Sequence, residues 1–489
     1  MNQYFLEKAE AIKPVLNEDV VRPVWIPDGI YCTGDRIVLD FGNHFVGRFF
    51  FRMHGEGSHQ DAPALLKVKF CEVKKEIEED SSRYQGWICA SWIQEERIHV
   101  DVLPAEVAMP RRYAFRYVVI DITAVSDKYG LVLDDAYAKV TTSAEDAALT
   151  VYQGNAKEMR MDEVALRTLR NCMQDVFEDG PKRDRRLWLG DLRLEALTNY
   201  VSYGNYSLVK RCMYLFAAVA DEEGRIPACL FTEPEVCGDD TYMFDYSLFF
   251  IAALYDYAAV SKDLETAREL YKTARRQWEL AQENFDENHV VRDSDVLGWC
   301  FLDWNLELNK QAGAQFVYLY CAKRLCLLAE LLEIPEDITE IKRDMALKKQ
   351  AALDYFYDRE KELFVSGSKK QISYASQVWG VLSECLEKEE NIQVLEHMRR
   401  CKDAVEMVTP YMNHCYVEAL IQVGMEKEAY AYMMHYWGGM MEDGADTFYE
   451  LFNPGNPSES PYGSCIVNSY CHAWSCTPAY FLRKYNLHG

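Results

Sequence analysis

The pattern of hydrophobic and polar positions divides the chain into two unequal parts. In residues 1–145, apolar and aromatic positions partly alternate with polar ones in runs bounded by Gly, Asp and Ser, as in IVLDFGNHFVGRFFFRMHG (37–55) and RRYAFRYVVIDITAV (111–125). β-Branched and aromatic residues at this period favour strands. We predict a β-sandwich domain here, because such strands need a second layer to bury their apolar faces.

In residues 146–489 the apolar positions recur at helical spacing. Twelve candidate helices make six hairpins, and no fixed sequence period links them, which disfavours an open solenoid. A closed (α/α)6 barrel accounts for helices that are apolar on nearly every face beside others that are amphipathic. We therefore predict a mostly α protein, with an (α/α)6-barrel catalytic domain after the smaller N-terminal domain. Candidate helices include 159–177, 206–221, 246–263, 264–285, 312–333, 340–358 and 429–441.

Composition and charge narrow the function. Hydrophobic residues make up 49% of the chain and aromatic residues 13%, as in a globular protein. The net charge of −25 disfavours nucleic acid and anionic membranes as partners. The start of the chain does not resemble a signal peptide, and no apolar run reaches the length of a membrane span. We expect a cytoplasmic protein whose 16 scattered cysteines are reduced; the sequence is compatible with a homodimer.

Two cysteine pairs are candidate metal ligands. Cys321 and Cys326 are five residues apart, as are Cys471 and Cys476, and His472 adjoins the second pair. Zinc sites favour tighter spacing with a matching second half, which neither pair has. Core packing is the favoured interpretation, and we expect no metal and no organic cofactor.

The first candidate site is EDGPKRDRRLWLGDLRLEA (178–196), where a Gly-Pro break is surrounded by charges. One interpretation is a solvated loop that leads into an ordinary helix. If the segment is helical from Asp184 onward, one face carries Asp184, Trp188, Asp191 and Glu195. Glycoside hydrolysis needs two carboxyl groups in different protonation states. Clustering of Asp179, Asp184 and Asp191 favours a protonated acid, and neighbouring arginines would sort the acids into roles.

A second candidate cluster is HYWGGMMEDGADTFYELFNP (435–454). Glu450 follows Phe448 and Tyr449, and an acid flanked by aromatic residues suits a pocket that stacks a sugar ring and positions a water molecule. The alternative is a helical turn whose glutamate faces solvent.

Three segments resemble glycoside hydrolase family 78, the α-L-rhamnosidases, in matching order: DGPKRDRRLWLGD, WGGMMEDGADTFYE and NSYCHAWSCTPAYFL. The N-terminal segments 40–55 and 111–122 are similar to the β-domain that precedes the family's barrel. This resemblance implies that Asp184 is the general acid and Glu450 the general base. It also implies a sugar subsite with strong matches at Asp179, Arg183, Trp188 and Asp191, and weaker matches at Asp245, Asp303, Trp304, Trp437 and His472.

Several of these residues have a second interpretation. His472 fits a hydrogen-bonded core histidine, and Asp245 and Asp303 fit structural roles at helix ends. The sequence also departs from the family: Asp184 stands where many members carry glutamate, and Asp446 stands where threonine is common. We expect Asp446 to add a charge near the base.

The resemblance implies an inverting exo-glycosidase that removes terminal α-L-rhamnosyl residues from small glycosides or oligosaccharides. One alternative is an enzyme of the same fold acting on another L- or deoxy-sugar. Another is a carbohydrate-binding protein with a decayed active site. A scaffold without a sugar ligand is the least favoured, because it does not need acids and tryptophans at two loops.

Overall fold

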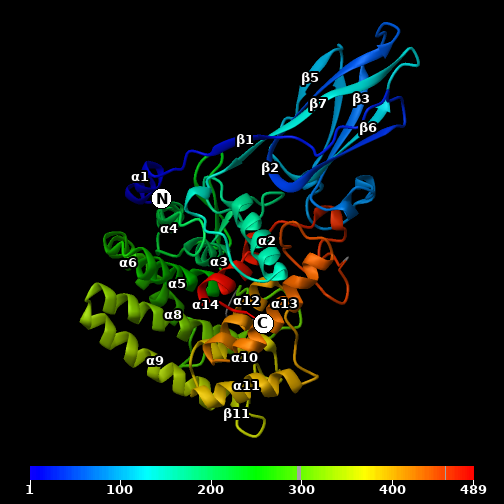
Figure 1. The fold of residues 1–489 in the computed structure, drawn as a ribbon. Helices are drawn as coiled ribbons and strands as arrows, with labels where there is room; N and C mark the ends of the chain where they lie inside the picture. The colour runs from blue at the N-terminus through cyan, green and yellow to red at the C-terminus, as the bar shows by residue number, and fades with distance from the viewer. Residues whose placement is uncertain (294–298, 458, 489) are drawn as a thin grey trace.

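The structure is a computed structural model that describes residues 1–293, 299–457 and 459–488. An N-terminal β-domain stands on a larger helical domain (Figure 1). Before the sheet, helix α1 (Gln3–Ala11) packs against α4 of the helical domain, with Asn2 capping its first turn. Along the part of the chain that the structure describes, no helix has the length and apolar character needed to cross a membrane.

Seven antiparallel strands form the β-domain, in the order β1-β7-β2-β6-β3-β4, with β5 paired to β2. The alternating positions noted in the sequence become the buried face of these strands. Their bounds are β1 (Asn17–Val21), β2 (Arg36–Gly57), β3 (Ala64–Cys71), β4 (Glu95–Val100), β5 (Ala105–Ala108), β6 (Tyr113–Ala124) and β7 (Tyr129–Thr142).

The long strand β2 belongs to both halves of this sheet. It pairs with β6 up to Gly47 and with β7 from Gly47 onward. A side chain at Gly47 would clash, because a Cβ there would lie 2.2 Å from the carbonyl oxygen of Lys139. Strands of both halves contribute to one core, in which the rings of Phe49 and Phe70 lie 5.8 Å apart. The predicted sandwich-like packing is thus confirmed.

The inner layer of the helical domain is a ring of helices that contact one another in chain order. These helices are buried on almost every face, as predicted for the inside of a barrel. The short helix η6 (Ala473–Ser475) contacts both α12 and α3 and so closes the ring. The inner helices are α3 (Leu189–Tyr200), α5 (Phe244–Ser261), α8 (Gln311–Leu332), α10 (Tyr374–Leu382), α12 (Pro410–Gln422) and α14 (Pro478–Tyr485).

The outer helices cover this ring and are mostly amphipathic. In α6, for example, Leu270, Ala274 and Trp278 are buried at four-residue spacing, while most of the intervening residues are not. The outer helices are α2 (Ala156–Cys172), α4 (Tyr206–Val219), α6 (Leu264–Gln282), α9 (Pro335–Phe356), α11 (Lys388–Arg400) and α13 (Glu426–Glu442). Inner and outer helices alternate along the chain, which confirms the predicted six-hairpin barrel.

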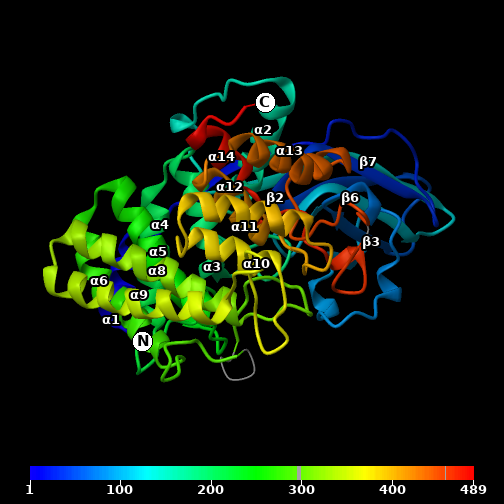
Figure 2. The same ribbon diagram turned by 90° about the horizontal axis from the view of Figure 1, so that it is seen from below.

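The β-domain and the barrel meet through buried polar contacts. Figure 2 shows strands β3 and β6 beside the C-terminal segment drawn in red. Glu72 follows β3, and its carboxylate accepts hydrogen bonds from the backbone N–H of Tyr470 at 2.8 Å and pairs with His44 at 2.9 Å. His44 in turn contacts Asn171 of α2 at 2.8 Å. The domain interface therefore reaches the two loops that carry the candidate site.

Candidate active site

Most of the predicted site residues lie in connections that lead into inner helices. Asp179 and Asp184 lie between α2 and α3, Asp303 lies before α8, and Glu450 and His472 lie between α13 and α14. Connections of this kind meet at one end of a barrel, where side chains from distant parts of the sequence can converge.

The loop before α3 holds Asp184 in an unusual backbone conformation. Asp184 has φ 58° and Arg185 has φ 54°, both in the left-handed region. Two hydrogen bonds between Asp179 and Arg186 close the loop. The N–H of Asp179 donates to the carbonyl of Arg186, and the N–H of Arg186 donates to the Asp179 carboxylate, both at 3.0 Å. Arg185 ties it further by donating to the carbonyls of Pro181 and Arg112. The Asp184 side chain remains 22% exposed, whereas those of Asp179 and Asp191 are buried.

The condition under which Asp184, Trp188, Asp191 and Glu195 would share one helical face is not met. Helix α3 begins at Leu189, and Trp188 belongs to the short strand β8 (Leu187–Trp188), which pairs with β9 (Cys229–Phe231). The left-handed turn at Asp184 is incompatible with a continuous helix. The acids converge through the folding of the loop, and only Asp191 and Glu195 share a helix.

The second loop buries Glu450, which is 3% exposed. Its carboxylate accepts a hydrogen bond from the Tyr462 hydroxyl at 2.7 Å and pairs with the guanidinium of Arg183. Its backbone is held as well, because its N–H donates to Ser469 and its carbonyl accepts from the Trp474 indole, both at 3.0 Å. Glu450 therefore does not lie on a solvent-facing helical turn. Both of its carboxyl oxygens have side-chain partners.

Arg183 joins the two candidate catalytic groups. Nη2 of its guanidinium contacts Glu450, and Nη1 lies 3.7 Å from the Asp184 carboxylate. Its Nε donates to the carbonyl of Val467 at 2.9 Å, and its head lies 4.2 Å from the Tyr462 ring centroid. These contacts fix the guanidinium between the two carboxyl groups.

His472 lies among three carboxyl groups. Its Nδ1 is 3.6 Å from Asp191, and its Nε2 is 3.8 Å from Glu450 and 4.0 Å from Asp179. Burial and the neighbouring Arg183 lower the pKa of His472 well below its usual value, so the ring is neutral. Among the described residues, neither His472 Nδ1 nor Asp191 Oδ1 has a hydrogen-bond partner. This pair of buried polar atoms suits the hydroxyl groups of a bound sugar.

Burial raises the pKa of all three of these aspartic acids. It raises the pKa of Asp179 well above its ordinary value, and the nearby Asp184 and Asp191 add to the effect. Burial likewise raises the pKa of Asp191. Asp184 also has a raised pKa because of burial, although Arg183 and Arg186 oppose this shift. Asp184 is the most accessible of these three acids, which fits a group that delivers a proton to a substrate.

Aromatic side chains connect the two sides of the pocket. Trp188 packs edge-on against Tyr246 at 6.1 Å, and the Phe301 ring stacks on Trp474 at 5.8 Å. Trp304 lies 5.4 Å from Trp474 and, like Trp188, is partly exposed. The predicted Trp188 and Trp304 are therefore neither fully buried nor fully exposed.

Sequence reasoning missed several residues of the pocket. Tyr246 and Trp474 adjoin predicted residues in MFDYS and CHAWS, so their motifs contained a usable signal. Tyr462 gave none, because it lies in a polar stretch, PSESPYGS, with no periodicity.

Asp245 and Asp303 support the pocket wall through backbone contacts. The Asp245 carboxylate accepts from the N–H groups of Phe301 and Leu302 at 2.8–3.0 Å. The Asp303 carboxylate accepts from the N–H groups of Val408 and Thr409 at 2.8 and 3.0 Å, and from the Thr409 hydroxyl at 2.7 Å. These contacts match the structural alternative that the sequence left open for both residues.

Two expectations need correction. Trp437 does not face the pocket: it is fully buried in α13, and its indole donates to the carbonyl of Ser475 at 3.0 Å. Asp446 does not place its charge beside the candidate base, because its side chain points toward α2. Its carboxylate accepts from Arg167 of α2 at 2.7 Å and from the N–H of His44 at 2.5 Å. In both cases the motif fixed the position in the chain but not the direction of the side chain.

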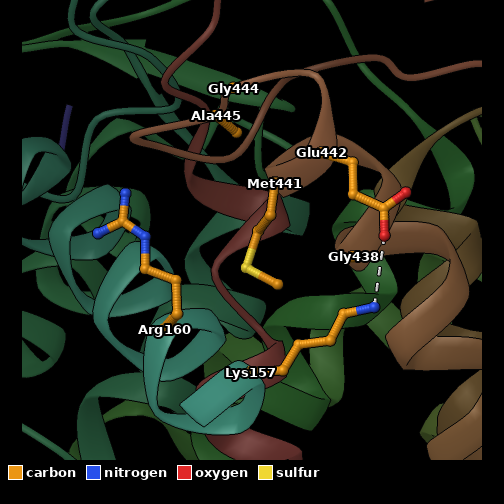
Figure 3. Close-up of a pocket in the computed structure, with 7 residues that line it drawn as sticks. All are labelled: Lys157, Arg160, Gly438, Met441, Glu442, Gly444 and Ala445. Carbon is orange, nitrogen blue, oxygen red and sulfur yellow. Dashed lines mark hydrogen bonds and ion pairs between the residues drawn. The ribbon is translucent and has the colours of Figure 1, made fainter.

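Two cavities lie apart from this cluster. One of about 310 Å³ lies between α2 and the end of α13, where Lys157 Nζ is 3.5 Å from Glu442 (Figure 3). The other, of about 640 Å³, is lined by residues 149–152 with parts of α2 and α14. Neither is lined by a predicted site residue. In the described ranges, no group of three or more His, Cys, Asp and Glu side chains has an arrangement suited to a metal ion.

Comparisons with known proteins agree with this architecture. Residues 6–140 match the glycosyl hydrolase family 78 α-rhamnosidase N-terminal domain, and residues 155–485 match the bacterial α-L-rhamnosidase six-hairpin glycosidase domain. The comparison with curated proteins finds no match.

Solved structures give the same result. A rhamnosidase from Klebsiella oxytoca with rhamnose bound is 44% identical, covers 99% of each chain and has a TM-score of 0.96. A family 78 rhamnosidase of Bacillus sp. GL1 shares the fold at 21% identity and a TM-score of 0.80, over 94% of this chain and 47% of its own. This chain therefore belongs to glycoside hydrolase family 78 and is a glycoside hydrolase of the α-L-rhamnosidase type.

Proposed function

We propose that this enzyme removes a terminal α-L-rhamnosyl group with inversion of configuration, with Asp184 as the general acid and Glu450 as the general base. The observation that carries the proposal is the position of Arg183 between two carboxyl groups that have different environments. Asp184 is partly exposed and has a raised pKa, whereas Glu450 is buried with both oxygens accepting. Different environments are what assign acid and base roles to a pair of carboxyl groups.

In the proposed reaction, Glu450 accepts a proton from a water molecule as that water attacks the anomeric carbon. The bond from this carbon to the leaving oxygen breaks, and Asp184 transfers its proton to that oxygen. The products are β-L-rhamnose and a free alcohol. An inverting enzyme needs room for the water, so its carboxyl groups are about 6.5–9.5 Å apart, against about 5–5.5 Å in a retaining enzyme.

The rest of the pocket suits sugar binding. Burial favours the protonated forms of Asp179 and Asp191, in which each carboxyl group can donate as well as accept a hydrogen bond. The neutral His472 adds another such group, and Trp188 offers an apolar ring face. The rhamnose in the Klebsiella oxytoca relative supports the choice of sugar.

Paired substitutions test the two roles. We expect Asp184→Asn to lower kcat about 10²- to 10⁴-fold on methyl α-L-rhamnoside, because a general acid contributes that much. The loss should be far smaller on 2,4-dinitrophenyl α-L-rhamnoside, whose leaving group needs no proton. Glu450→Gln should slow both substrates by similar factors, because the attack of water is part of the reaction with either leaving group.

The matched control is Asp221→Asn. Asp221 is 24% exposed, close to the 22% of Asp184, but it pairs with Arg225 outside the pocket. This variant should keep the parent rates. Equal losses on the two substrates for Asp184→Asn would contradict its role as acid, and near-normal rates for Glu450→Gln would contradict its role as base.

A further inference from the structure

A loop of the β-domain reaches the edge of the active site. Residues 84–93 pack against residues 461–467 in a small apolar cluster that includes Ile93, Ile466 and Val467. The approach is very close at Gly86, where an added Cβ would lie 1.8 Å from the carbonyl oxygen of Tyr462. The backbone of this loop is therefore held against the segment that supplies the partner of the general base.

Trp87 stands at the outer end of this contact. Its side chain is 74% exposed, yet its indole N–H donates to the carbonyl of Pro461 at 2.9 Å. The hydrogen bond fixes the ring's orientation while most of the ring stays in contact with solvent. A large aromatic ring that is held in place but uncovered is suited to bind an apolar ring face with little loss of conformational entropy.

An unbroken series of contacts joins Trp87 to the reacting groups. Its ring centroid lies 5.5 Å from that of Tyr462. The Tyr462 hydroxyl binds Glu450, and its ring lies against Arg183, which also contacts Asp184. Tyr462 thus links Trp87 to Glu450 and to Arg183, which contacts both carboxyl groups.

Exposure increases outward along this side of the pocket. Tyr462 is buried, Trp304 lies 6.0 Å from it and is partly exposed, and Trp87 is largely exposed. In an enzyme that removes a terminal sugar, that sugar occupies the buried end of the pocket. The leaving group then extends outward, past the exposed aromatic side chains of the rim.

We propose that Trp87 is a leaving-group subsite, on which a ring with a flat apolar face stacks while the rhamnosyl group lies between Asp184 and Glu450. The ring belongs either to an aromatic aglycone or to a second pyranose, since both present such a face. The inference rests on the proposed function and deepens it, because it assigns part of the substrate specificity to the β-domain.

Trp87→Ala and Trp87→Phe test the subsite with three rhamnosides that differ in the leaving group: methyl, phenyl and glucosyl. Trp87→Ala should lower kcat/KM about 3- to 10-fold on the ring-bearing substrates, the value of one aromatic contact, and leave the methyl substrate unchanged. Trp87→Phe should restore part of the loss, because it keeps a ring. A loss confined to the phenyl substrate identifies an aromatic aglycone, and a loss confined to the glucosyl substrate identifies a second sugar.

Trp25→Ala is the control, since Trp25 is a similarly exposed tryptophan of the β-domain, at 65%. It should leave all three rates unchanged, and inhibition by free rhamnose should be the same in every variant. Equal losses on all three substrates in Trp87→Ala, or no loss on any, would overturn the subsite alone. Failure of the unaltered protein to release rhamnose from any of them would overturn the proposed function as well.

Discussion

Lys182 is the residue through which the β-domain should act on the catalytic loop. Its side chain is 2% exposed; its ammonium pairs with Glu76, lies 3.6 Å from Glu72 and donates to the carbonyl of Asn468 at 2.8 Å. Both glutamates belong to the β-domain, and Lys182 directly precedes Arg183. We predict that Lys182→Met destabilises the domain interface and lowers activity together.

The burial of Lys182 and its two glutamate partners determines how much stability Lys182→Met should lose. Methionine fills most of the volume of Lys182 but leaves Glu72 and Glu76 buried without their cation. Removing one partner of a buried ion pair costs about 3–5 kcal/mol. Without the ammonium the pKa values of both carboxyl groups should rise above those of the unfolded chain, so the variant should lose stability as pH rises. The destabilisation should therefore be larger at pH 8 than at pH 5.

Urea unfolding at the two pH values measures this loss, and kcat/KM should fall about 10-fold or more because Arg183 is displaced. Lys182→Met/Glu76→Gln should recover part of the stability, because it removes one of the two uncompensated charges. Lys75→Met is the control: Lys75 is 27% exposed and pairs with Asp443 at 3.1 Å, so its loss should cost at most about 1 kcal/mol. A loss of less than about 1 kcal/mol for Lys182→Met, or one equal at both pH values, would refute the reasoning.

Three further predictions follow from buried groups of the site. Among the described residues neither carboxyl oxygen of Glu195 has a hydrogen-bond partner, and burial with the nearby Asp191 raises its pKa well above 4.5. The folded state then loses stability as pH rises above 4.5, so Glu195→Gln should raise the melting temperature at pH 8 more than at pH 5; equal changes would contradict this. The raised pKa of Asp184 should set the alkaline limb of kcat/KM, since the acid works only when protonated, and this limb should be missing in Asp184→Asn with an activated aryl substrate. Tyr462→Phe removes the 2.7 Å hydrogen bond to Glu450, worth about 1.5–3 kcal/mol, and should lower kcat/KM about 10- to 150-fold; unchanged kinetics would show that this bond does not serve catalysis.

The layers of the fold could be predicted because the hydrophobic pattern determines them. Strands with one buried face alternate, as β2 and β6 do, and helices that are apolar all round, such as α8 and α10, must lie inside others. What the pattern could not supply is backbone conformation in a loop. The loop around the left-handed turn at Asp184 is held by the hydrogen bond from Arg185 to Arg112, a residue far away in the sequence, and by the one from Arg186 to Asp179.

Side-chain direction was the second limit. Short motifs selected Arg183 and His472, whose side chains lie beside the candidate catalytic carboxyl group of Glu450. They failed for Trp437, which is buried in the core. A tryptophan followed by two glycines in a helix has the same sequence pattern whether its side chain faces the site or the core. Tyr462 could not be inferred at all, since its role depends on a loop that folds back onto Glu450.

Proton NMR during hydrolysis of an aryl α-L-rhamnoside tests the central claim most directly, because the anomeric signal reports how water attacks. With Glu450 as the base and Asp184 as the acid, β-L-rhamnose should appear first and the α anomer should follow only by mutarotation. Early release of the α anomer would contradict direct attack by water and require a covalent intermediate instead. Release of no rhamnose would contradict the assignment of the sugar.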